Sequence, residues 1–147
     1  MKKQRLALFD LDHTLIPFDS GMAWTRFLVR EGALDDEAEA RYLGFCHQYV
    51  AGTLDIHAMV RTNLLPLVAF EPAQVALWRG RFEQETTAQL PVAMRELVAQ
   101  HRERGDLCAV VTATERLVAE PFARAFGIEH LMATEGEMVN GPPTGEI

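Results

Sequence analysis

Two acidic side chains follow directly on an apolar run near the start of the chain, in the stretch "LALFDLDHTL", where they are Asp10 and Asp12. Residues two apart in extended backbone project to the same side, so both carboxylates can face one site. Their mutual repulsion is relieved by a hard divalent cation such as Mg²⁺, which prefers oxygen ligands. Such a pair also suits phosphoryl transfer, because one carboxylate can attack phosphorus while the second acts as general acid and base.

A hydroxyl closes a second apolar run, "DLCAVVTATE", at Thr112. In an open parallel sheet, ligands bind outside the carboxyl ends of the strands. If the two runs are neighbouring strands, Thr112 stands beside Asp10 and Asp12. Its hydroxyl and the backbone N–H groups that follow, beginning with that of Ala113, would then form a small phosphate-binding cradle near a helix N-terminus.

The order of apolar and helical patterns along the chain predicts an α/β fold. The continuously apolar run over residues 6–10 is typical of a strand covered on both faces. Strands alternate with helices after it, which indicates a parallel sheet, and the helical block between the first two strands is too long for a simple crossover. We therefore expect a Rossmann-like core, residues 1–16 and 91–147, with a helical cap, residues 17–90, inserted after the first strand. The predicted helices cover about residues 20–32, 34–50, 52–67, 71–90, 91–105 and 115–126, the later strands cover 106–112 and 130–134, and 135–147 is a candidate hairpin around 140–143.

Composition excludes several classes of protein. The 147-residue chain has a formal net charge of -7 and no stripe of Lys or Arg, so binding to a nucleic-acid backbone is not expected. The apolar run at the N-terminus is too short for a secretory signal, and no run approaches the length of a membrane span. The two cysteines, Cys46 and Cys108, form no CxxC pair and are typical of small core residues. We therefore expect a cytoplasmic protein that associates with neither nucleic acid nor membrane.

The stretches "FDLDHTL" and "VVTAT" resemble the first and second motifs of the haloacid dehalogenase superfamily, which are Asp-x-Asp-x-Thr after an apolar strand and an apolar strand closing on Thr or Ser. The helical block between them resembles the cap of the phosphoserine-phosphatase-like branch (subfamily IB). By position, the resemblance implies that Asp10 is the nucleophile and a metal ligand, and that Asp12 is the general acid and base and binds the metal through its backbone carbonyl. It also implies that Thr112 and Ala113 bind the transferring phosphoryl group.

The same resemblance implies two substrate-binding residues. Asp19 stands nine positions after Asp10, where phosphoserine phosphatases have an acid that meets the substrate amine, and Arg61 is placed like the cap Arg that holds the substrate carboxylate. Both have simpler interpretations, since Asp19 can cap the helix that follows and Arg61 can be a solvated helix residue. His13 lies between the acids and Thr14, and we expect a supporting role for it rather than a metal-binding one.

The superfamily has two further motifs that this sequence does not show after Thr112: a Lys that neutralises the charge cluster, and an acidic Gly-Asp-x-x-x-Asp motif that completes the metal site. The last lysine of the chain is Lys3. We therefore expect a core that is incomplete at its C-terminal side, as in a fragment, a truncated gene product or a subunit completed by another chain. The first strand would then have an unpaired edge and an uncovered apolar face, which favours self-association into a homo-oligomer. Asp10 and Asp12 alone would bind Mg²⁺ weakly.

The resulting hypothesis is a magnesium-dependent phosphomonoester hydrolase that acts on a small, phosphoserine-like phosphorylated metabolite through an aspartyl-phosphate intermediate. A phosphotransferase with the same intermediate differs only in the acceptor. A phospho-accepting receiver also gathers acids, a Thr and a Lys around Mg²⁺, but the helical insertion and the absent Lys argue against it. The absent motifs support a third alternative, a non-catalytic remnant or binding module.

Overall fold

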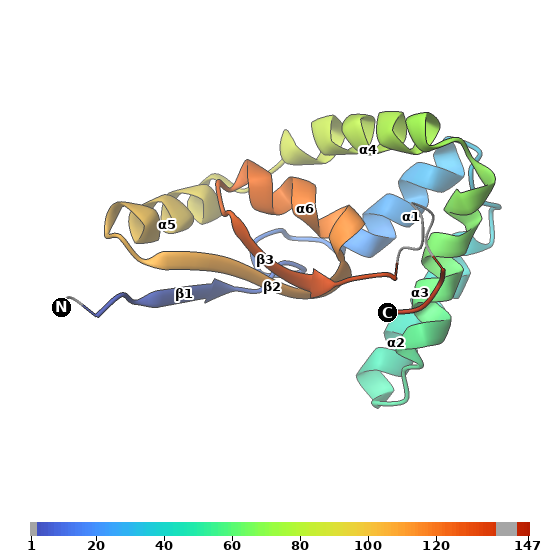
Figure 1. Ribbon diagram of the computed structural model, residues 1–147, viewed down its shortest axis with the longest axis horizontal. Helices are drawn as coiled ribbons and strands as arrows, with labels where there is room; N and C mark the ends of the chain where they lie inside the picture. The colour runs from blue at the N-terminus through green and yellow to red at the C-terminus, as the bar shows by residue number, and fades with distance from the viewer. Residues whose placement is uncertain (1–2, 138–143) are drawn as a thin grey trace. The chain divides into compact units, whose positions relative to one another are not determined.

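A sheet-containing unit and a helical unit make up the protein. The computed structural model describes residues 3–137 and 144–147. One compact unit consists of Met1–Ser20 and Glu83–Thr134, and the other of Gly21–Phe82 and Glu135–Ile147. The elements in chain order are β1 (Leu6–Phe9), α1 (Ser20–Arg30), α2 (Ala38–Ala51), α3 (Ile56–Leu64), the 3-10 helix η1 (Leu65–Ala69), α4 (Pro72–Thr87), α5 (Val92–Glu103), β2 (Leu107–Glu115), α6 (Arg116–Ala125) and β3 (His130–Thr134) (Figure 1).

Three parallel strands in the described part of the first unit form one sheet, in the spatial order β1-β2-β3. β1 pairs with β2 from Leu6 opposite Leu107 to Phe9 opposite Val110. α5 leads into β2, and α6 connects β2 to β3, so helices alternate with strands as parallel pairing requires. The predicted fold class, a Rossmann-like parallel sheet with a helical insertion after its first strand, is confirmed.

The helices α5 and α6 cover one face of the sheet, and residues of β1 and β2 are buried beneath them. Phe9 of β1 and Val110 of β2 are buried there, and α6 contributes Val118 and Phe122 to the same core. Cys108 of β2 is also buried, and burial raises the pKa of its thiol, so this side chain stays protonated. The expectation that Cys108 is a small core residue is confirmed.

The opposite face of the sheet is uncovered among the described residues. Leu6 and Leu8 of β1 are 58% and 61% exposed, and Val111 of β2 and Met132 of β3 are 39% and 63% exposed. The prediction that β1 is covered on both faces is therefore wrong, because α5 and α6 both pack on the same side of the sheet (Figure 1). A continuously apolar run is compatible with either arrangement, since hydrophobicity alone does not specify where helices lie.

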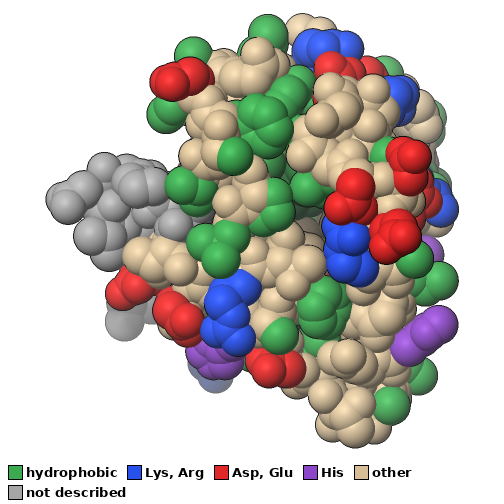
Figure 2. All heavy atoms as spheres, turned by 90° about the vertical axis from the view of Figure 1, so that its right-hand side faces the viewer, with side chains coloured by type: hydrophobic (Ala, Val, Ile, Leu, Met, Phe, Trp, Pro, Cys, Tyr) green, Lys and Arg blue, Asp and Glu red, His purple; other side chains and the backbone are tan. Residues whose placement is uncertain are grey.

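Aromatic packing holds the helical unit together. The rings of Trp24 and Phe27 in α1 and of Phe82 in α4 are buried, with centroids 5.1 to 5.7 Å apart. At the surface, Arg81 binds Glu31 through two hydrogen bonds of 2.7 and 2.8 Å. Figure 2, which looks onto this unit, shows basic side chains next to acidic ones and no basic patch among the described residues of that face.

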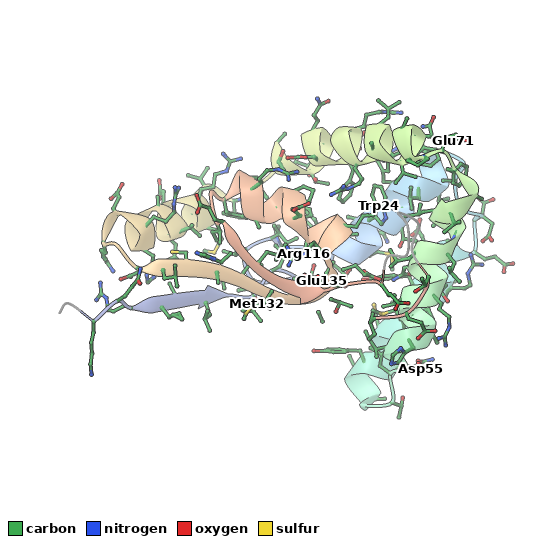
Figure 3. All side chains as sticks on the ribbon, viewed as in Figure 1. Trp24, Asp55, Glu71, Arg116, Met132 and Glu135 are labelled. Carbon is green, nitrogen blue, oxygen red and sulfur yellow. The ribbon has the colours of Figure 1, made fainter. Side chains whose placement is uncertain are left out.

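The predicted helices are all present, with bounds shifted where local hydrogen bonds decide the start. α2 begins at Ala38 rather than near residue 34, because Asp35 accepts a hydrogen bond from the Glu37 N–H in a turn before the helix. α3 begins directly after Asp55, whose side chain accepts from a first-turn N–H and caps the helix (Figure 3). β2 continues to Glu115, three residues beyond its predicted end at residue 112.

The compact units differ from the predicted domain boundaries at two places. Residues 83–90 belong to the first unit, and residues 135–147 are grouped with the second. The division into a core of residues 1–16 and 91–147 and a cap of residues 17–90 stays a prediction.

Two sequence-based expectations concern the end of the chain and its hydropathy. The turn of the candidate hairpin, residues 140–143, lies outside the described residues, while the Thr144 N–H beside it donates to the Glu137 carbonyl at 2.9 Å.

Within residues 3–137 and 144–147, no helix is both long enough and apolar enough to cross a bilayer.

A charged cluster ties together the amino ends of β1 and β2. Asp106 accepts hydrogen bonds from Arg5 at 2.9 Å and from His101 at 2.8 Å, and its side chain is only 6% exposed. The hydrogen bond from His101, reinforced by the one from Arg5, holds the pKa of the Asp106 carboxyl below its ordinary value of 3.8. Ionised Asp106 therefore stabilises the folded state.

We expect this stabilisation to depend on pH. A carboxyl whose folded-state pKa is lowered contributes stability above its unfolded pKa, here about 4, and loses it as pH falls through the folded value. Asp106→Asn should lower the free energy of unfolding at pH 6. Between about pH 5 and pH 2, the free energy of unfolding of this variant should fall less steeply than that of the unmodified protein. Urea unfolding across that range measures both effects, with the exposed Asp36→Asn as control. Equal pH dependence in Asp106→Asn and the unmodified protein would contradict the prediction.

Candidate active site

Asp10 stands directly after β1, at the carboxyl end of the strand, and is exposed. The Thr14 hydroxyl donates a hydrogen bond of 2.8 Å to its Oδ2. Between these residues the chain turns sharply, because His13 has a φ of 53° and the Leu11 carbonyl accepts N–H groups from Thr14 and Ile16. Leu11 and Ile16 are completely buried, so the loop that carries Asp10 is anchored in the core. The His13 side chain is exposed.

Asp12 is half-buried, and both of its carboxylate oxygens accept hydrogen bonds. The N–H of Ser20, the first residue of α1, donates to Oδ1 at 2.6 Å. The Thr114 hydroxyl donates to Oδ2 at 2.8 Å, and the Thr112 hydroxyl lies 3.5 Å from the same oxygen. The side chain of Asp12 thus lies at the N-terminus of α1, where backbone N–H groups point toward it.

Thr112 and Ala113 lie where β2 leaves its regular pairing with β3. The register of the two strands shifts between Val111 and Glu115, so the strand is irregular at this point. The Thr112 hydroxyl accepts the Thr114 N–H at 3.1 Å. Ala113 is exposed, and its carbonyl accepts a hydrogen bond from a β3 side chain. The structure thus brings Thr112 against Asp12, with Ala113 at the surface beside it.

The sequence predicted no contact between Asp12 and either Thr114 or Ser20, the two residues that make the shortest hydrogen bonds to it. Both are buried, and their hydroxyl oxygens lie 3.2 Å apart. The spacing of Thr114 offered a signal, because a residue two positions after Thr112 projects to the same side of a strand. Ser20 offered a weaker one, since it was noted only as the start of a helix.

The two predicted substrate-binding residues have different surroundings. Asp19 is half-buried and directly precedes Ser20. Arg61 lies in α3, in the helical unit, and its guanidinium pairs with Glu146 at 3.1 Å. His57 lies 3.2 Å from the other oxygen of the same carboxylate. Arg61 is therefore an ion-paired residue in this structure, which the sequence did not indicate.

A protein-family model for haloacid dehalogenase-like hydrolases matches residues 7–147 of this sequence. The chain belongs to that family. Its motif residues Asp10 and Asp12 follow the carboxyl end of β1, and Thr112 lies in β2 just beyond the last residue that pairs with β1. Ligands bind at this edge of a parallel sheet.

Two curated relatives of this family member carry phosphatase names. The histidinol-phosphatase of Neisseria meningitidis serogroup C is 34% identical over 136 residues, which is 91% of this chain and 61% of that protein. A probable phosphatase of Mycobacterium tuberculosis is 30% identical over 145 residues, covering 96% of this chain and 50% of that protein. The chain thus spans between half and two thirds of the length of the relatives it matches.

Solved structures share the fold. A protein of unknown function from Bordetella pertussis superposes with a TM-score of 0.87 at 42% sequence identity, over 99% of this chain and 67% of that one. A phosphoserine phosphatase with a phospho-aspartyl intermediate analogue superposes with a TM-score of 0.65 at 19% identity, over 99% of this chain and 63% of that one. The second similarity concerns the fold alone.

Phosphatases of the haloacid dehalogenase family generally use Mg²⁺. Asp10 fits such a cation, because its carboxylate is an exposed oxygen donor at the strand end. The Asp12 carboxylate is occupied by hydrogen bonds, so its backbone carbonyl is the more suitable donor. No group of three His, Cys, Asp or Glu side chains suited to a metal occurs among the described residues. The Asp10 carboxylate and the Asp12 carbonyl would be the groups of this chain that hold a Mg²⁺ ion, and this assignment stays a prediction.

We expect Asp12 to matter for folding as well as for chemistry. Asp12→Ala leaves the buried Thr114 hydroxyl and the Ser20 N–H without their acceptor, and should lower the free energy of unfolding by about 1–3 kcal/mol. Asp10→Ala is the matched control: it removes a carboxylate two residues away that is exposed, and should change stability by about 0.5 kcal/mol or less. Chemical denaturation of both variants measures the difference. Equal stability of the two variants would contradict this account of Asp12.

Proposed function

We propose that this chain is the catalytic part of a magnesium-dependent phosphomonoester hydrolase that forms an aspartyl-phosphate on Asp10. The observation that supports this most is the pairing across the sheet: Asp10 stands exposed after β1, and Asp12, two residues later, is held against Thr112 and Thr114 of β2. Membership in the haloacid dehalogenase-like hydrolase family and the two phosphatase-named relatives support the same reaction class.

The proposed reaction uses the two acids in sequence. A carboxylate oxygen of Asp10 attacks phosphorus, the bond from phosphorus to the leaving oxygen breaks, and the carboxyl form of Asp12 gives that oxygen its proton. Asp12, now ionised, takes a proton from the water that attacks the aspartyl-phosphate, which releases inorganic phosphate and restores both side chains. Asp10 and the Asp12 carbonyl would hold a Mg²⁺ ion, which would supply positive charge to offset that of the phosphoryl oxygens.

Thr112 and Ala113 are the proposed phosphoryl-binding groups. Thr112 accepts the Thr114 N–H and lies 3.5 Å from Asp12, a long contact, so its hydroxyl proton can turn to a phosphoryl oxygen. Ala113 is exposed, and its N–H is the proposed second donor.

The proposed substrate is a small phosphorylated metabolite, and the structure bears on its class. In a phosphoserine-like substrate, Asp19 would meet the amine and Arg61 the carboxylate. Glu146 already pairs with Arg61, however, so a substrate carboxylate would have to displace it. An amino alcohol phosphate such as histidinol phosphate has an amine and no carboxylate, and the histidinol-phosphatase of Neisseria meningitidis is a 34% identical relative. We therefore propose an amino alcohol phosphate ahead of a phosphoserine-like compound as the substrate class.

Completion by further polypeptide is part of the proposal. The uncovered sheet face exposes Leu6, Leu8, Val111 and Met132, and Met132 lies on the side of the sheet away from α6 (Figure 3). β1 has a partner strand on one edge only within the described residues. Apolar faces and free edges of this kind are normally covered. The covering partner would be a completing chain or a second copy of this one, and a cytoplasmic location stays a prediction from sequence.

We expect the purified chain with Mg²⁺ to release phosphate from p-nitrophenyl phosphate, and Asp10→Asn to abolish the release, because an amide cannot form the acyl phosphate. Asp36→Asn, an exposed change in the helical unit, should retain activity. Two quantities are measured in each experiment: the phosphate released, and the phosphoprotein that survives acid and is cleaved by hydroxylamine, as an aspartyl-phosphate is. A stable phosphoprotein without turnover would favour a receiver, and release of the phosphoryl group only to an added alcohol would favour a phosphotransferase. Absence of both turnover and phosphoprotein would favour a non-catalytic remnant.

We expect histidinol phosphate to be hydrolysed with a higher kcat/KM than phosphoserine. Glu146→Gln frees the Arg61 guanidinium and should raise kcat/KM for phosphoserine by about two- to fivefold, since exposed ion pairs contribute about 0.2–1 kcal/mol. Histidinol phosphate should be unaffected, and the exposed Glu129→Gln is the matched control. A preference for phosphoserine that Glu146→Gln does not alter would contradict the role given to this ion pair.

A further inference from the structure

The shortest hydrogen bond that a side chain makes to Asp12 comes from Thr114, rather than from Thr112. The Thr114 hydroxyl lies 2.8 Å from Oδ2 of Asp12, compared with 3.5 Å for Thr112. Thr114 is buried, and the irregular register of β2 between Val111 and Glu115 sets its position. Its own N–H donates to the Thr112 hydroxyl oxygen, so the backbone at this point is held as well as the side chain.

The hydrogen bonds around Thr114 have a defined direction when Asp12 is ionised. A carboxylate can only accept, so Thr114 gives its single hydroxyl proton to Oδ2. The Ser20 hydroxyl, 3.2 Å from the Thr114 oxygen, must then be the donor of that contact. The result is a chain of hydrogen bonds from the buried Ser20 hydroxyl to the buried Thr114 hydroxyl to the half-buried Asp12 carboxylate.

The two oxygens of Asp12 have different partners. Oδ1 accepts the Ser20 N–H at 2.6 Å, whereas Oδ2 faces the hydroxyls of Thr114 and Thr112. Thr114 therefore holds the carboxylate from the side of β2, opposite the start of α1.

We propose that Thr114 is a positioning residue that holds the Asp12 side chain in place for its role as general acid and base in phosphoester hydrolysis. The inference rests on the phosphatase function proposed above. Because Thr114 is buried, it would act through Asp12 rather than on the substrate itself.

Leaving-group dependence tests this role. Thr114→Val keeps the shape of the side chain and removes the hydroxyl, whereas Thr114→Ser keeps the hydroxyl. An alkyl phosphate needs a proton on its leaving oxygen and p-nitrophenyl phosphate does not. Thr114→Val should therefore lower kcat on an alkyl phosphate about ten- to a hundredfold more than on p-nitrophenyl phosphate. Thr114→Ser should stay within about threefold of the unmodified protein on both substrates. Equal losses on the two substrates, or a Ser variant as impaired as the Val variant at equal folded fraction, would overturn the proposal.

A second measurement does not depend on turnover. The Ser20 amide proton, bonded to Oδ1, reports the position of Asp12 in a ¹H–¹⁵N spectrum. Thr114→Val should shift that resonance and speed its exchange with solvent, and Thr114→Ser should restore both. An unchanged Ser20 amide in Thr114→Val would overturn the positioning role. If the unmodified chain hydrolyses neither substrate while the amide responds as expected, the proposed function fails and the contact between Thr114 and Asp12 stands.

Discussion

The parallel register between β1 and β2 is the constraint on which the candidate site depends. It sets Phe9 opposite Val110, so the two strands reach the same edge of the sheet together. Two to three residues beyond this pair, Asp12 after β1 meets Thr112 in β2, although the two residues are one hundred positions apart in the sequence. A slip of one residue would turn Thr112 to the opposite face and remove the contact, because side chains alternate along a strand. The alternation of buried and exposed residues in β1 opposes such a slip, since it would expose Phe9.

A half-buried carboxylate next to a strand end is costly unless its charge is compensated. Asp12 has a hydrogen-bond donor on each oxygen, one of them at the start of α1, where the helix dipole adds a favourable field. This compensation needs no cation, so the carboxylate can be held in place before any ligand arrives. Asp10 differs, because its exposed carboxylate has water as an alternative partner and is accessible to a cation or a phosphoryl group. Two acids two positions apart thus have different surroundings, which suits two different chemical roles.

The ion pair of Arg61 in the helical unit shows that the position of a residue in the sequence does not establish that it binds substrate. Arg61 occupies a position that resemblance associates with a substrate carboxylate, and the structure supplies a carboxylate from this same chain, that of Glu146. All the partners in this cluster are near half exposure, so the pairing is weak enough to be exchanged for a ligand. Recognition by Arg61 would therefore be a competition between two carboxylates.

The sequence by itself determined the α/β class, the helical insertion after the first strand and the position of Asp10 and Asp12 directly after that strand. Each of these follows from a local pattern: a short apolar run, a polar residue that closes it, or helical periodicity. Only the tertiary structure decided that Thr114 rather than Thr112 makes the shorter bond to Asp12, that α5 and α6 cover one face of the sheet and leave Leu8 exposed, and that Glu146 pairs with Arg61. These features depend on contacts between residues far apart in the chain, whose distances local periodicity does not specify.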